Sequence, residues 1–284
     1  MAVGAMSPAG TRGTGEVYIR ESGRPGSPAI VFIHGGGPSG RMWGAHLERL
    51  ATRFHCLAPD LPGFGLSNHL ASLSLDETAD LLAELIEARV PTRQAHVVGL
   101  SYGGSVVLAM LDRHPERVVR AVIDGAAVLP VWGGWGDRLV QLGAIAVSPI
   151  VGTRLVRSFL RRIGLGELGE MLRGVAPTAF RRAYLEGFTA PLTRAELVAP
   201  CPTLLVAGEK EATVRASNAA LAALMPHAAA CFVPGLSHAW FGWRRDLHVR
   251  MVEAWLGDDP LPAELVPEPP SPLAVDRVLR LLYG

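Results

Sequence analysis

Lysine is almost absent from this 284-residue sequence: of its 27 basic residues, only Lys210 is a lysine and the others are arginines. We attribute this bias to genome base composition. It restricts any catalysis through a lysine Schiff base to Lys210. Net charge is nearly absent as well, at +1. The chain as a whole therefore lacks the field that holds nucleic acid or an anionic membrane, and its charge predicts neither partner.

Cysteine is also scarce. The three cysteines, Cys56, Cys201 and Cys231, are an odd number, their spacing fits no metal site, and each lies in or beside an apolar run. We expect them to be small buried side chains in a reducing compartment, without a disulfide or metal role.

Long hydrophobic runs are missing too. The longest, residues 139–151, is short for a bilayer span and contains Gln141 and Pro149. The first 15 residues are rich in Gly, Ala, Ser and Thr and have no apolar core of a signal peptide. The sequence therefore predicts a cytoplasmic protein without a membrane span.

What the sequence does contain is a regular alternation of apolar strands and amphipathic helices. Apolar residues make up 49% of the chain and charged residues 19%, which is enough for a sizeable core. The pattern predicts an α/β fold, with a mostly parallel central sheet covered by helices on both faces. The expected strands are residues 16–20, 29–33, 54–58, 95–98, 118–123, 203–207 and 230–233, and the expected helices are residues 42–50, 75–88, 102–113, 216–224 and a segment ending near 255.

The alternation is interrupted once. Residues 127–198 have helical periodicity and no convincing strand, so we expect a helical insertion between two parts of the core, residues 14–126 and 199–257. Residues 258–284 begin with the proline-rich segment DDPLPAELVPEPPSP and end with an amphipathic stretch. We expect an extended linker followed by a short C-terminal helix.

The strongest chemical signal is GLSYGG at residues 99–104, placed between an expected strand and an expected helix. G-x-S-x-G in this context is typical of a nucleophilic serine on a sharp, strained turn. Gly99 and Gly103 leave room for the neighbouring chain to pass close to the turn. The helix that follows directs its positive end toward developing negative charge. We therefore predict that Ser101 is a nucleophile.

A second glycine-rich loop, HGGGPSG at residues 34–40, follows the expected strand at 29–33. It is not a phosphate-binding loop, because no GK[ST] sequence follows. Two backbone N–H groups, one from this loop and one from the residue after the nucleophile, would form an oxyanion hole. We assign these donors to Gly36 and Tyr102.

These motifs together resemble the serine-hydrolase branch of the α/β-hydrolase family. HGGGPSG resembles its oxyanion loop, DLPGFGLS at 60–67 its D-x-P-G-x-G-x-S turn, VVGLSYGG at 97–104 its nucleophile elbow, and VPGLSH at 233–238 its late histidine loop. The resemblance implies that the helical insertion is a cap domain. Members with aspartate as nucleophile include dehalogenases and epoxide hydrolases, and Ser101 argues against both.

The general base is expected to be His238, because a serine hydroxyl is a weak nucleophile until an imidazole takes its proton. His34 is expected to brace the oxyanion loop. The other seven histidines are expected at the surface or at helix ends: His46, His55, His69, His96, His114, His227 and His248.

Two carboxylates are candidates for the third member of the triad. The family's usual G-E-x-D motif is GEKE at 208–211 here, so Glu211 stands where an aspartate is common. Some members place the acid after the preceding strand, where this chain has Asp124. We predict Glu211 as the acid and keep Asp124 as the alternative, with Glu209 a distant third.

Substrate contacts are expected from the oxyanion loop and the cap. We assign them to Gly35, Gly37, Trp132 and Trp135, and expect an apolar acyl pocket because the cap is rich in aliphatic and aromatic residues. The predicted reaction is cleavage of an ester, lactone or thioester through an acyl-serine, with no metal or organic cofactor.

Two other functions remain open at this point. HGGGP also resembles the loop of hydrolases that split carbon–carbon bonds in vinylogous diketo acids. A ligand-binding receptor with little turnover could use the same scaffold, although the Ser–His pair argues against it. A homodimer is also left open.

Overall fold

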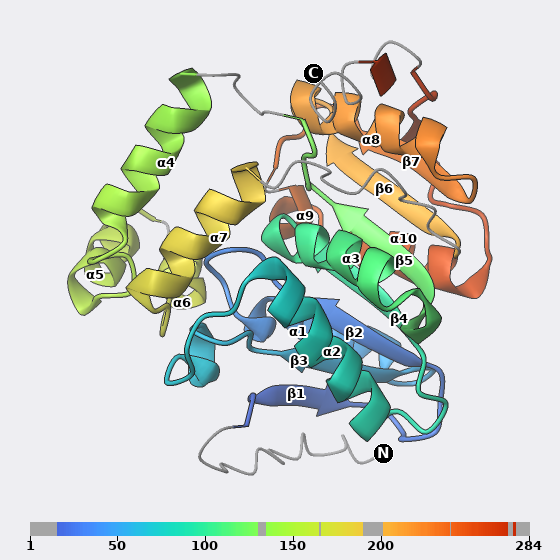
Figure 1. Ribbon diagram of the computed structural model, residues 1–284, viewed down its shortest axis with the longest axis horizontal. Coiled ribbons are helices and arrows are strands. Elements are labelled where there is room, and N and C mark those ends of the chain that lie inside the picture. The colour runs from blue at the N-terminus through green and yellow to red at the C-terminus, as the bar shows by residue number, and fades with distance from the viewer. Residues whose placement is uncertain are drawn as a thin grey trace.

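A single eight-stranded sheet forms the centre of the protein, and helices cover both of its faces (Figure 1). The computed structural model describes residues 16–129, 135–164, 166–189, 201–238, 240–271 and 275–276. The strand order is β1-β3-β2-β4-β5-β6-β7-β8. The predicted fold class, α/β with a mostly parallel sheet, is confirmed.

The six inner strands are parallel, and only the two edge strands run antiparallel to their neighbours. Four inner strands are buried at every residue, which explains why the sequence shows continuous apolar runs there instead of alternation. The strands are β1 (Ile19–Ser22), β2 (Ala29–Ile33), β3 (His55–Pro59), β4 (Ala95–Leu100), β5 (Val118–Asp124), β6 (Thr203–Gly208), β7 (Ala228–Val233) and β8 (Val266–Pro267).

Two helical layers enclose the sheet. One core cluster joins it to α2 (Leu75–Arg89), α3 (Tyr102–Arg113) and α8 (Ala212–Leu224). The other joins it to α1 (Gly44–Leu50) and α10 (Arg245–Gly257), with the short α9 (Trp240–Trp243) beside them.

The cap consists of α4 (Trp135–Val147), α5 (Arg154–Arg162), α6 (Gly166–Met171) and α7 (Pro177–Thr189), and stands to one side of the core in Figure 1. Helix α7 lies directly on core loops: a Cβ added to Gly63 would come within 2.4 Å of Ala179 Cβ. A polar contact fixes the same helix, because Glu186 accepts a 2.9 Å hydrogen bond from the Leu75 N–H at the start of α2. The Ala176 N–H also donates to the Gly63 carbonyl at 2.8 Å, so small residues and hydrogen bonds together hold the cap against the core.

Most expected elements agree with the structure to within a few residues, and two differ in an informative way. The first strand covers Ile19–Ser22 instead of residues 16–20, because its partner in the sheet is β3 from Cys56 to Pro59. The proline-rich linker is not free: Val266–Pro267 pairs with β7 as an edge strand, where proline is tolerated. Of the expected C-terminal helix, only residues 275–276 are described.

The three cysteines, Cys56, Cys201 and Cys231, are buried as expected, and each is a free thiol in the structure. Burial raises the pKa of the Cys56 and Cys231 thiols to about 12, so neither is a reactive thiolate. Among the helices of the described residues, none combines the length and apolar character needed to cross a bilayer.

Candidate active site

Ser101 occupies the turn between β4 and α3 with φ 56° and ψ −118°, a conformation that non-glycine residues seldom adopt. The flanking glycines make the turn possible. A Cβ on Gly99 would lie 2.3 Å from the Gly103 carbonyl oxygen, and a Cβ on Gly103 would lie 2.3 Å from the Ile33 carbonyl oxygen. The Ser101 N–H donates to the Asp124 carbonyl at 2.7 Å, which ties the turn to β5.

His238 lies against the serine. Its Nε2 atom is 3.0 Å from Ser101 Oγ. The histidine is in the loop that follows β7, and its side chain is 52% exposed. A backbone glycine lies under the ring: a Cβ on Gly125 would come within 2.8 Å of His238 Cε1. Gly125 is not among the predicted site residues, although its place directly after a strand, at φ +70°, is the kind of position that requires glycine.

Glu211 completes a continuous chain of hydrogen bonds. Its Oε1 atom is 2.7 Å from His238 Nδ1, and its Oε2 atom accepts the Gly208 N–H at 2.7 Å. Glu211 is the N-cap residue of α8, yet its carboxylate makes no capping bond to that helix, because it is turned toward the histidine. The Gly208 N–H thus holds the carboxylate in the orientation that reaches Nδ1.

Asp124, the alternative acid, is bonded elsewhere. Its side chain is 1% exposed and accepts the Trp240 indole N–H at 3.0 Å, while His248 Nε2 lies 3.5 Å from its other oxygen. Burial raises the pKa of Asp124. Glu209 is bonded elsewhere too, since it accepts the Gly235 N–H at 2.6 Å. Of the three carboxylates considered, Glu211 is the one that contacts the His238 ring.

The expectation that the remaining histidines lie at the surface or helix ends is wrong for four of them. His46, His55, His96 and His248 are buried. His46 Nε2 and His248 Nδ1 are 2.7 Å apart, and both rings pack against tryptophans. Burial lowers the pKa of His46 well below 6.5, so it is neutral there. An imidazole with a partner and an aromatic neighbour can be buried at little cost, which apolar periodicity does not reveal.

The expected oxyanion loop lies beside the serine. A Cβ on Gly36 would be 3.4 Å from Tyr102 Cβ, so the two assigned N–H donors belong to neighbouring residues. Tyr102 is the first residue of α3, and the first N–H groups of a helix have no partner within it. This arrangement supports Gly36 and Tyr102 as oxyanion donors.

His34 braces this loop, as predicted. Burial lowers the pKa of His34 and keeps the ring neutral. Its Nδ1 lies 2.8 Å from the Gly35 carbonyl, and its Nε2 accepts the Leu61 N–H at 2.9 Å. The buried Asp60 adds a second brace, accepting the Gly40 N–H at 2.8 Å and pairing with Arg20. In the sequence, Asp60 was only the first residue of the D-x-P-G-x-G-x-S motif, and no role was predicted for it.

The expected substrate contacts are partly observable. Gly35 lies next to the nucleophile, since a Cβ there would be 3.5 Å from Ser101 Cβ. Gly37 faces the cap, with Leu172 Cδ2 at 3.1 Å from such a Cβ. Trp132 lies outside the described residues, and of Trp135 the structure describes only that its backbone begins α4.

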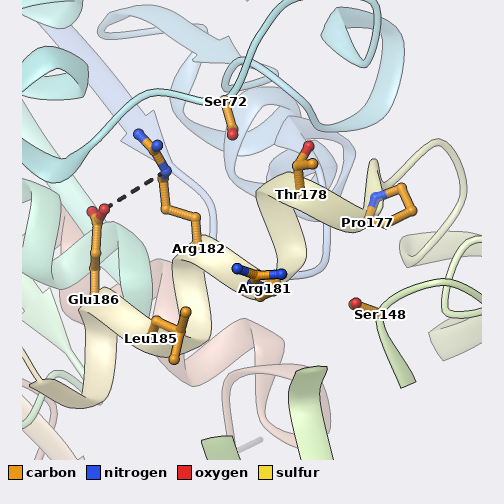
Figure 2. A pocket seen from close by; sticks show the side chains of 8 residues that line it. All are labelled: Ser72, Ser148, Pro177, Thr178, Arg181, Arg182, Leu185 and Glu186. Carbon is orange, nitrogen blue, oxygen red and sulfur yellow. Dashed lines mark ion pairs between the residues drawn. The ribbon is translucent and has the colours of Figure 1, made fainter. Parts of the chain in front are cut away.

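A separate recess of about 460 Å³ lies beside α7, and Ser72 of the core and Ser148 of the cap also line it. Figure 2 shows its lining, in which Arg182 pairs with Glu186 at 3.7 Å and Arg181 points along the same surface. None of the triad residues lines it. Ala183, which contacts the oxyanion loop at Gly36, does not line the recess either, so we do not regard this recess as the reaction site.

The surroundings of His238 shift the pKa of its imidazole in two opposing ways. Partial removal of the half-exposed ring from water lowers its pKa, but the hydrogen bond and charge of Glu211, with a further contribution from Asp124, outweigh that effect, and the pKa is raised above its usual value of 6.5. A neutral base with such a pKa becomes a stabilised imidazolium once it accepts a proton. The described residues contain no cluster of His, Cys, Asp and Glu arranged to hold a metal ion.

Comparison with known proteins agrees with this architecture. Residues 30–254 match the alpha/beta hydrolase family. The protein is a member of that family. In this α/β hydrolase, helices α4–α7 occupy the position of the cap.

Individual relatives are more distant. The chain is 40% identical over 95 residues to a pimeloyl-[acyl-carrier protein] methyl ester esterase of Vibrio vulnificus, covering 34% of this chain and 35% of the relative. It is 37% identical over 103 residues to a 2-hydroxymuconate semialdehyde hydrolase of Pseudomonas sp. strain CF600, covering 34% and 36%. The alignments thus span about a third of the curated relatives' length.

Solved structures match over more of the chain but with lower identity. An enol-lactonase of Burkholderia xenovorans LB400 superposes with a TM-score of 0.69 at 19% identity, over 85% of this chain and 96% of the lactonase. At this identity the likeness establishes the shared fold and leaves the substrate undetermined.

Proposed function

We propose that this α/β hydrolase is a serine hydrolase that cleaves a carboxylic ester, lactone or thioester with an apolar acyl group. One observation carries the proposal: the continuous chain from Ser101 Oγ through His238 to Glu211, with distances of 3.0 and 2.7 Å. Such a chain activates a hydroxyl that is otherwise a weak nucleophile at neutral pH.

Acylation begins when Ser101 Oγ attacks the carbonyl carbon. A carbon–oxygen bond forms, the π electrons move to the carbonyl oxygen, and His238 Nε2 takes the hydroxyl proton. Glu211 keeps the other ring nitrogen protonated and stabilises the imidazolium. The tetrahedral intermediate then collapses: the bond to the leaving group breaks, and the leaving group receives the proton from His238.

Water completes the cycle. The oxygen of a water molecule attacks the acyl-serine while His238 takes a proton from that water. The second tetrahedral intermediate then releases the carboxylic acid. Ser101 regains its proton from the imidazolium. In both intermediates the Gly36 and Tyr102 N–H groups donate to the oxyanion, and each such donor is worth roughly 10²- to 10³-fold in kcat.

The acyl group is inferred from what lies above the oxyanion loop. Cap residues Leu172 and Phe180 face Gly37, and Ala183 faces Gly36. These side chains offer apolar contact and no charge to a substrate. The names of the relatives, which include an esterase and an enol-lactonase, agree with acyl chemistry but do not fix the substrate.

A fluorophosphonate probe tests the activated serine without knowledge of the substrate. We expect labelling of the wild-type enzyme and none of Ser101→Ala. Aryl esters of increasing acyl length, lactones and a thioester then define the substrate class, with Ser101→Ala as control. Absence of labelling in the folded wild-type enzyme would contradict the proposal.

A second candidate is hydrolysis of a carbon–carbon bond in a vinylogous diketo acid. The HGGGP loop and the relative described as a 2-hydroxymuconate semialdehyde hydrolase favour it. Glu211, where that group usually has aspartate, counts against it. Turnover of a dienoate ketone with no turnover of simple esters would select this candidate.

A further inference from the structure

Large apolar side chains are exposed mainly in one part of the molecule. Of the twelve exposed large hydrophobic residues that the structure describes, seven lie between positions 139 and 163 of the cap. Soluble monomers rarely expose apolar patches of more than a few hundred Å², and larger ones mark interaction sites. We call this set the cap-edge surface: Leu139 (67% exposed), Leu142 (60%), Val147 (44%), Ile150 (50%), Leu155 (78%), Phe159 (60%) and Ile163 (53%).

The cap-edge surface follows two helices and the turn between them. Leu155, Phe159 and Ile163 are spaced four residues apart and so form one stripe along α5. Leu139 and Leu142 form a similar stripe on α4, and Ile150 lies in the connection. In Figure 1, α4 and α5 form the margin of the cap that lies farthest from the sheet. The exposed residues of the cap-edge surface thus belong to the helices that lie farthest from the sheet.

Arginines outnumber acids at this surface, although Arg161 pairs with Glu170 of the neighbouring α6 at 3.7 Å. Residues 139–163 contain four arginines and no aspartate or glutamate. With about 100° between successive residues of a helix, Arg162 falls on the same outward side as Leu155, and Arg154 on its flank. Arg154 and Arg162 are both exposed. The net charge of +1 for the whole chain therefore conceals a local cationic surface, and it is the local charge that a partner meets.

We propose that the cap-edge surface docks on an anionic lipid membrane. Aliphatic residues and phenylalanine on one side, with arginines beside them, are the pattern of helices that lie in the headgroup region. A second copy of this chain fits less well, because a two-fold contact would bring together two patches that both carry an excess of arginine. The docking is peripheral, in agreement with the lack of any membrane-spanning helix among the described residues.

Co-sedimentation with lipid vesicles tests the inference, and it does not depend on the proposed reaction. We expect the wild-type protein to bind phosphatidylcholine vesicles containing about one third phosphatidylglycerol, and to bind pure phosphatidylcholine much more weakly. Binding should weaken at high salt, because about 1 M salt shortens the screening length to roughly 3 Å.

Two double variants separate the apolar and the charged contributions. Leu155→Ser with Phe159→Ser should lower the vesicle partition coefficient at least tenfold. Arg154→Gln with Arg162→Gln should lower it roughly 25-fold, or about fivefold for each arginine. All four side chains are exposed, so the fold and the hydrolysis of a short soluble ester should be unchanged.

Matched controls carry the same chemical changes on the core. Val119→Ser with Leu224→Ser removes two exposed apolar side chains, and Arg24→Gln with Arg93→Gln removes two exposed charges. Both should bind like the wild type. The inference is overturned if the wild type ignores anionic vesicles, if the controls lose as much binding as the cap variants, or if the wild type is a dimer that Leu155→Ser with Phe159→Ser dissociates.

Discussion

The core and the cap of this α/β hydrolase are built on different physical principles. In the core, buried parallel strands end at one edge of the sheet and bring Ser101, Glu211 and the His238 loop together. In the cap, short helices contact the core through small residues on α7 and leave much apolar surface exposed. From this comparison we propose that the core carries out the bond-breaking chemistry and that the cap selects the acyl group.

This difference predicts two kinds of mutational effect. Changes in the core groups should abolish the reaction whatever the substrate, because those groups act on the atoms that react. Changes in the cap should alter the ranking of substrates by smaller factors, because each apolar contact contributes little. The following experiments test the division, beginning with the largest effect.

Loss of the nucleophile or base should be the most damaging change. We expect Ser101→Ala and His238→Ala each to lower kcat by about 10⁶-fold, as coupled triad members do. Circular dichroism and thermal melting check that the fold is intact. If either variant retains activity within tenfold of the wild type, the assignment of the chemistry to these core residues is wrong.

The two carboxylates should differ strongly. Glu211→Gln should cost about 10⁴-fold in kcat, because an amide no longer fixes the productive tautomer of His238. Asp124→Asn should cost far less, since an amide can still accept the Trp240 N–H. Steady-state kinetics on one aryl ester compare the two. A larger loss for Asp124→Asn would show that Asp124, at the end of β5, is the acid of the triad.

The contact between cap and oxyanion loop can be tested with a compensating pair. A Cβ on Gly36 would lie 2.8 Å from Ala183 Cβ, so Gly36→Ala should displace the loop from α7. We expect a loss of about 10²-fold in kcat, comparable to removal of one oxyanion donor. Adding Ala183→Gly should restore much of it, and Ala183→Gly alone serves as the control. If Ala183→Gly does not restore the kcat of Gly36→Ala, contact with the cap does not position Gly36.

Acyl-chain length should reveal the cap's contribution. Each methylene buried against apolar cap residues is worth up to about 0.8 kcal/mol, or roughly fourfold in kcat/KM, until the pocket is full. We expect kcat/KM to rise from acetyl to hexanoyl esters. A flat or falling series would show that the cap does not select for apolar acyl groups.

The smallest effect concerns pH. Because His238 must be neutral to act as base and its pKa is raised by Glu211, kcat/KM should increase with pH through a midpoint above 6.5. In Glu211→Gln the raising influence is lost, so the midpoint of the residual activity should fall. If the midpoint is the same in this variant as in the wild type, Glu211 does not raise the pKa of the base.

The sequence was most informative where backbone geometry restricts residue choice. Gly99 and Gly103 are needed for the close approach around Ser101, so the turn was predictable from the motif. The choice between Glu211 and Asp124 was not, because both follow strands that end at the same sheet edge. That choice depends on side-chain direction: the Gly208 N–H binds the Glu211 carboxylate, and the Trp240 indole N–H binds the Asp124 carboxylate.

Contacts between residues far apart in the chain could not be predicted from sequence patterns either. His46 and His248 are 202 residues apart in the chain, and only tertiary packing brings their rings together. Pairing of Val266–Pro267 with β7 likewise depends on a long-range contact. In the cap, helical periodicity was visible, but it did not show that the apolar stripes of α4 and α5 are exposed.

Trapping of the acyl-enzyme is the most direct test of the central claim that the core performs acyl transfer through Ser101. The wild-type protein is mixed with an aryl hexanoate, quenched with acid within the first turnover, digested and analysed by mass spectrometry. We predict that the peptide containing Ser101 carries the hexanoyl mass, and that Ser101→Ala carries none. Release of the aryl product in the first turnover with Ser101 unmodified, or with the acyl group on another residue, would contradict this account.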